Sequence, residues 1–130
     1  MYEPIRTKPV DPRIDGRRSD YPRSSRSEAL DIQLGGHLAA LLAVTDELGL
    51  EAAAAGIAAQ VARLRGAQPT RAPRSSRQDA ETVAALHQQA RDLAARALLV
   101  AASRADTTVA ILAAERMDAH SAALELVGAH

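Results

Sequence analysis

Apolar residues recur at alternating spacings of four and three along most of the chain after residue 29. The first stripe of this kind contains Leu30, Leu34, His37, Leu41, Val44 and Leu48. This spacing places all its members on one face of a helix. Ser25 and Glu28 form a capping-box pattern before the stripe, and Gly49 follows it as a typical C-terminal glycine. The pattern predicts a helix over about 26–48.

Three further stripes predict three further helices. The second helix, over about 50–65, carries Ala54, Ile57, Val61 and Leu64 and ends at Gly66. The third, over about 77–104, opens near Ser76 and Asp79 and carries Val83, Leu86, Ala90, Leu93, Ala97 and Val100. The stripe changes phase over 103–108. The stripe that follows contains Val109, Leu112, Ala113, Met117, His120, Leu124 and Val127. We expect a turn there, with Asp106 as the N-cap of a fourth helix over about 106–127.

Prolines and charge divide the chain into alternating segments. All six prolines lie within residues 1–27 and 66–78, and each of these two segments has a net charge of +3, whereas 28–65 and 79–130 each have −3. Basic, proline-containing segments are typical of a tail and a linker. We therefore predict an all-α fold: an antiparallel four-helix bundle of two helical hairpins over 27–128, with the linker at 66–78 and an extended basic N-terminal arm over 1–26.

Composition narrows the classes of protein that the chain can belong to. The chain has 130 residues and no Cys, which excludes disulfide scaffolds, thiolate metal sites and Cys nucleophiles. No apolar stretch has the form of a signal peptide or a membrane span, so we expect a cytoplasmic, soluble protein that does not contact membranes. The richness in Ala and Arg, beside a single Lys, is typical of a GC-rich bacterial genome.

The expected core is lean, which bears on function. Leu, Ile and Val make up only about a fifth of the chain and Phe is absent. Homo-oligomerisation, or docking on a larger protein, would supply the missing buried surface, whereas the alternative is a self-sufficient Ala-rich monomer. We expect the arm to carry the protein-interaction residues, which are Tyr2, Arg17, Arg18, Tyr21, Arg23 and Arg26.

The histidines His37, His87 and His120 fall on three different predicted helices. A metal site inside a bundle needs ligands one helical turn apart, such as Glu-x-x-His on two helices, and this pattern is missing. A site assembled between helices from His37, His120 and Glu115 stays an alternative. Core histidines with backbone partners are the simpler interpretation, and we expect no cofactor.

Two adjacent glycines interrupt the first helix. Gly35 and Gly36 each disfavour a helix interior by about 1 kcal/mol relative to Ala, so a compensating contact is expected. The pair follows no strand and lacks the further glycines of a phosphate-binding loop. We interpret it as a close packing contact, with a ligand-facing break in the helix as the alternative.

The function hypothesis is a non-catalytic assembly or accessory subunit that binds copies of itself or a larger protein through its arm and its Ala-rich seams. The sequence has no nucleophile elbow, no phosphate-binding loop and no paired carboxylates, which are the features that would indicate an enzyme. One alternative is a regulator that binds nucleic acid through the arm, although Glu3, Asp11, Asp15 and Asp20 reduce the arm's positive charge. A second alternative is a bundle that binds a metal or small ligand near His37 and His120.

Overall fold

The chain folds into four α-helices. The computed structural model describes the backbone of residues 7–128 and the side chains of residues 25–128. The helices are α1 (Thr7–Glu47), α2 (Glu51–Arg65), α3 (Ala80–Arg104) and α4 (Thr107–Gly128). The described backbone contains no strand. The predicted all-α fold of two hairpins is confirmed.

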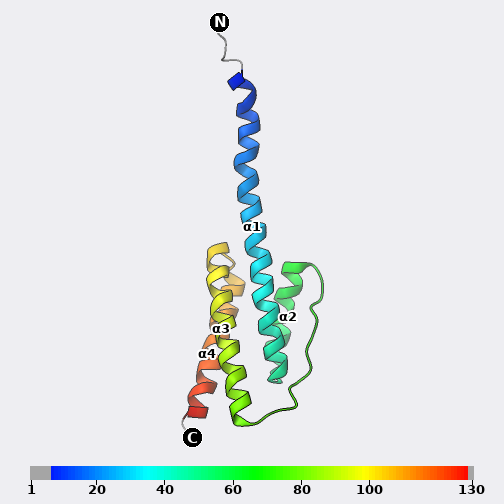
Figure 1. Ribbon diagram of the computed structural model, residues 1–130, viewed down its shortest axis with the longest axis vertical. Coiled ribbons are helices and arrows are strands. Elements are labelled where there is room, and N and C mark those ends of the chain that lie inside the picture. Colours follow the sequence, from blue (N-terminus) through cyan, green and yellow to red (C-terminus); the bar gives the residue numbers. More distant parts are fainter. Residues whose placement is uncertain (1–6, 129–130) are drawn as a thin grey trace.

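The helices form a bundle around the C-terminal half of α1 (Figure 1). α1 packs against α2 and α3, and α3 packs against α4. The linker runs back along α2, so that α3 starts at the end of the bundle where α1 finishes (Figure 1). α1 and α2 are therefore antiparallel, as are α3 and α4, whereas α2 and α3 run in the same direction (Figure 1). α1 projects beyond the other three helices at its N-terminal end (Figure 1).

Helix boundaries follow the predicted signals except at the start of α1. α1 begins at Thr7, so Ser25 lies inside the helix instead of capping it, and the helical backbone includes most of the segment assigned to the arm. Extending a formed helix adds backbone hydrogen bonds without a new nucleation step, which favours continuation over a new start even though Pro12 and Pro22 have no N–H to donate. The predicted turn between α3 and α4 is confirmed, because α4 begins directly after Asp106, whose carboxylate accepts a hydrogen bond from the backbone N–H of Val109 at 3.2 Å.

Large side chains in the core come mainly from α1, and small ones from α3. α1 buries Leu34, Leu38, Leu41, Leu42 and Val44, and the turn after it buries Leu48. α3 and α4 bury Ala90, Ala94, Ala97, Ala101 and Ala113, each with no exposed surface. Small side chains allow neighbouring helix backbones to approach closely, whereas leucines fill the volume between them. The predicted lean core is thus built from one leucine-rich helix surrounded by alanine-rich ones.

The linker is attached to the end of α1 by polar contacts. The guanidinium of Arg71 donates to both carboxylate oxygens of Asp46, at 2.6 and 2.9 Å, and the N–H of Ala72 donates to the same carboxylate at 3.0 Å. The hydrogen bond from Arg71 is the main reason why the pKa of Asp46 lies below its usual value. The N–H of Ser75 donates to the carbonyl of Glu47 at 2.9 Å. These bonds fix the linker on the bundle although it has no regular secondary structure.

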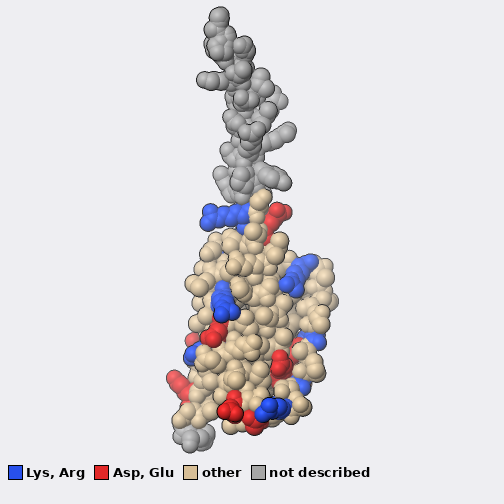
Figure 2. Space-filling view, in the orientation of Figure 1, with Lys and Arg blue, Asp and Glu red and all other residues tan. Residues whose placement is uncertain are grey.

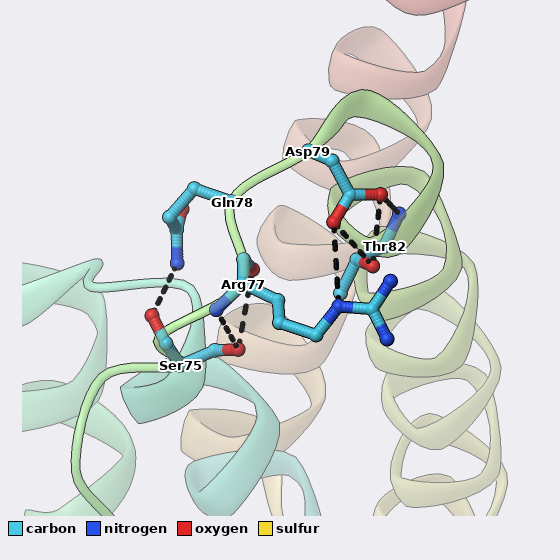
Figure 3. A network of polar contacts seen from close by, with 5 residues as sticks. All are labelled: Ser75, Arg77, Gln78, Asp79 and Thr82. Carbon is cyan, nitrogen blue, oxygen red and sulfur yellow. Dashed lines mark hydrogen bonds and ion pairs between the residues drawn. The ribbon is translucent and has the colours of Figure 1, made fainter.

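A polar network fixes the first turn of α3 (Figure 3). Asp79 is the N-cap, and its carboxylate accepts from the backbone N–H of Thr82 at 3.0 Å and from the Thr82 hydroxyl at 2.8 Å. Arg77 forms an ion pair with the same carboxylate at 3.6 Å. Just before it, Gln78 donates to the carbonyl of Ser75 at 2.8 Å (Figure 3). This network sets where α3 begins and in which direction it leaves the linker.

Two ion pairs join the helices at the opposite end of the bundle. Arg104, in the last turn of α3, donates to Asp31 of α1 at 3.1 Å. Arg63, near the end of α2, donates to Asp106 at 2.7 Å. The first of these pairs sets the antiparallel register of α1 against α3, which decides which side chains can meet.

Candidate functional site

A histidine pair lies between α3 and α4. Nδ1 of His87 on α3 is 2.9 Å from Nδ1 of His120 on α4, and the ring centroids are 5.1 Å apart with the planes tilted by 51°. His120 has no exposed surface, and His87 is partly buried. His120 follows the buried Val109 and Ala113 on the same face of α4, so its helical position directs it inwards. The pair is a polar contact inside the interface between α3 and α4.

Arg116 lies one helical turn before His120 and contacts the outer nitrogen of its ring. Its Nη2 is 3.5 Å from Nε2 of His120, a long contact in which the guanidinium can only donate. If Nε2 of His120 accepts, its proton sits on Nδ1 and is donated to Nδ1 of His87. The proton of His87 then sits on Nε2. Nε of Arg116 is buried and has no hydrogen-bond partner among the described residues. The three side chains thus form a directed chain of donors.

The electrostatic environment keeps both imidazoles neutral at pH 7. Burial, then the cation of Arg116 and then His87 lower the pKa of His120 to about 4. Burial and Arg116 also lower the pKa of His87. Burial lowers the pKa of Arg116 as well, against the opposing effect of Glu115. A proton added to this pair therefore creates a second cation beside the cation of Arg116.

The arrangement has two nitrogen atoms that could bind a metal ion, which is too few for a closed site. Among the residues whose side chains are described, no group of three His, Cys, Asp or Glu could hold a metal ion. Glu115 precedes His120 by five positions, which at 3.6 residues per turn puts it on the other side of α4, where it is exposed. The cation of Arg116 further disfavours a bound cation. The site is suited to a proton-dependent contact between helices.

His37 does not join this pair. The contact between Arg104 and Asp31 gives a common starting point on α3 and α1. Because these helices are antiparallel, going forward along α1 and going back along α3 lead in the same direction. His37 is six residues from this point and His87 is seventeen. The difference of eleven residues corresponds to an axial separation of about 16 Å. The structure thus brings His120 to His87, and it does not assemble the predicted group of His37, His120 and Glu115.

Sequence reasoning missed His87 as the partner of His120, although a signal was present. His87 lies eighteen positions before Ala105, the C-cap of α3, and His120 lies fifteen positions after it. Residues at similar distances from a tight turn meet in an antiparallel hairpin. The position of the predicted turn could therefore have identified the pair.

The two central glycines of α1 have different surroundings. A Cβ on Gly35 would lie 3.3 Å from Nε of Arg65, so the packing of α2 on α1 explains this glycine. A Cβ on Gly36 would meet nothing within 4 Å. The predicted close contact is present at Gly35, and Gly36 has no such contact with the described side chains.

The predicted interaction residues of the arm fall mostly outside the described side chains. These residues are Tyr2, Arg17, Arg18, Tyr21 and Arg23. Arg26, the last of the predicted set, is exposed on α1.

Comparison with protein-family models, with curated proteins and with solved structures found no significant match. Within residues 7–128, no helix has the length and apolar character needed to cross a membrane.

Proposed function

We propose that this protein is a non-catalytic helical assembly subunit, which associates with copies of itself or with a larger protein. The observation that carries the proposal is a set of large apolar side chains left on the surface of the bundle. These are Ile32, Leu99, Leu126, Ile111 and Val127, with exposed fractions of 74, 71, 67, 55 and 37%. Removing these aliphatic side chains from water against a partner would be favourable, which supports a protein partner.

The composition of the core supports the same proposal. Seven of the nineteen buried apolar residues are alanines: Ala54, Ala58, Ala90, Ala94, Ala97, Ala101 and Ala113. An alanine contributes much less burial energy than a leucine or phenylalanine. Association would bury the exposed side chains and add to a core that is small for a single chain.

The net positive charge of the arm also supports association with a protein partner. Residues 1–27 carry a net charge of +3, and the α3/α4 segment 79–130 carries −3. Opposite charges on two surfaces accelerate association and restrict which partners fit. An acidic helical surface of another subunit is a suitable target for this arm.

The test is affinity purification of the full-length chain from its native extract, followed by native mass spectrometry. We expect either several copies of the chain or one stoichiometric partner protein. A monomer without a partner would overturn the proposal. Excess absorbance at 260 nm that disappears after nuclease treatment would instead favour the nucleic-acid alternative.

The role of the arm is tested in the same experiment by charge reversal in the full chain. Replacing Arg17, Arg18 and Arg23 together by Glu should reduce the native mass or the retention of the partner. Unchanged mass and retention would remove the arm from the proposal and leave the exposed apolar residues of the bundle as its basis.

A further inference from the structure

The outward side of α1 is not covered by the rest of the described bundle. Between Asp31 and Asp46 the sequence has no charged residue on any side of the helix, a composition typical of a helix that is buried all round. Only the inward side is buried, however, and Ile32 is 74% exposed. The surface over the C-terminal half of α1 shows few charged atoms between its upper and lower ends (Figure 2). This side of α1 therefore has the character of an interface.

Positions on the outward side follow a second regular spacing. We name them the outer seam of α1; they are Arg26, Ala29, Gln33, Gly36, Ala40, Ala43 and Glu47. Their spacings alternate between three and four residues, as in the a and d positions of helices that pair at about 20°. Arg26, Ala29, Gln33 and Ala40 are exposed, and Gly36, Ala43 and Glu47 are partly buried. The outer seam thus has the spacing for helix pairing, and the described part of the chain buries none of its members fully.

Gly36, at the middle of the seam, indicates where a second helix would pack. The neighbouring Gly35 is explained by Arg65 of α2, whereas the space beside Gly36 is open. Glycine in a helix interior is unfavourable unless something compensates for it. A second backbone that approaches closely at Gly36 would provide that compensation.

The charges at the ends of the seam identify the partner as a second copy. The seam begins at Arg26 and ends at Glu47, and its midpoint falls between Gly36 and His37. Two copies that cross antiparallel at this midpoint bring Arg26 of each copy to Glu47 of the other, as two-fold symmetry requires. A parallel pairing would instead place like charges together at both ends.

The geometry of such a pair is feasible. Each end of the seam lies about 16 Å from the crossing point along the helix axis. At a crossing angle of about 20° the two helices diverge there by about 5 Å, a gap that the long Arg and Glu side chains can span.

We propose that the chain forms a two-fold symmetric, antiparallel homodimer through the outer seam of α1, with the symmetry axis at Gly36 and an ion pair between Arg26 and Glu47 at each end. The inference rests on the proposed assembly function and names its partner as a second copy of this chain.

The first test is Gly36→Leu in the full-length chain, measured by sedimentation equilibrium and native mass spectrometry. A Cβ at Gly36 meets no atom of the monomer within 4 Å, whereas a leucine side chain there separates two helices that meet at this position. Gly56→Leu is the matched control, because Gly56 is also exposed inside a helix and a Cβ there also meets nothing within 4 Å. We expect a dimer for the wild type and for Gly56→Leu, and a dissociation constant at least about tenfold higher for Gly36→Leu.

A charge exchange tests the orientation of the pair. Arg26→Glu and Glu47→Arg should each weaken the dimer, and the combined Arg26→Glu, Glu47→Arg variant should restore it. Damage to the fold would not be repaired by the second substitution, so this series decides the question even if Gly36→Leu fails to fold.

The outcomes separate this inference from the proposed function. If the wild-type chain is dimeric and neither Gly36→Leu nor the charge series changes its mass, the dimer uses another surface and this inference is wrong. A chain that is monomeric alone but bound to a larger complex overturns the dimer and leaves the assembly function standing. A monomer without any partner overturns both.

Discussion

Acidification should destabilise the bundle through His120. In the folded chain the pKa of His120 is about 4, because burial and the cation of Arg116 disfavour the imidazolium; the ordinary value is 6.5. The unfolded chain therefore binds more protons than the folded chain between about pH 6.5 and pH 4. Stability consequently falls as the pH is lowered through this window. The lowered pKa of His87 acts in the same direction.

The size of the effect follows from the two pKa values of His120. The difference between an ordinary value of 6.5 and a folded value of about 4 corresponds to about 3 kcal/mol of unfolding free energy once protonation is complete. Of this, about 2 kcal/mol is lost between pH 7 and pH 5. Asp46, Asp79 and Asp106 have lowered pKa values, so the stability that they contribute is lost only as the pH falls through values below 3.8.

The assay is urea unfolding followed by far-ultraviolet circular dichroism at pH 7 and pH 5. We compare the wild type with His120→Leu, which removes the titrating group and keeps an apolar side chain in the interface. His37→Gln is the control, because His37 lies far from the pair along the bundle. We expect the wild type and His37→Gln to lose about 2 kcal/mol between the two pH values, and His120→Leu to lose clearly less. Equal losses for all three proteins would refute the reasoning.

Three further predictions concern stability, each measured by chemical or thermal unfolding. Leu38→Ala, at a side chain with no exposed surface, should lower the unfolding free energy by about 2–5 kcal/mol. Gln89→Ala, at an exposed side chain of α3, is its control, and equal losses would contradict the assigned core. Ala105→Gly should raise stability by about 1 kcal/mol, because Ala105 has a φ of 59° that favours glycine; a lower melting temperature would count against it. Asp46→Asn should lower stability by about 1 kcal/mol and speed proteolysis of the linker, because its contact with Arg71 weakens; an unchanged cleavage rate would show that the linker is held by other contacts.

Local features of the sequence were enough for most of the helical organisation. The change of phase near Ser103, together with Asp106, predicted the turn between α3 and α4, because the periodicity and the N-cap are both properties of a few consecutive residues. The start of α1 was placed at Ser25 instead of Thr7. Capping signals show where a helix can begin, and they do not exclude a helix that continues through them.

The tertiary structure decided which helix faces meet. His37 and His120 were considered together from sequence because both lie on apolar stripes, yet the register of α3 against α4 brings His87 to His120. Gly35 and Gly36 are equivalent in the sequence, and only the position of α2 shows that one is packed and the other open. The spacing of residues along one helix specifies which side is apolar. The partner of that side depends on contacts between residues far apart in the chain, which the pattern of a single segment does not contain.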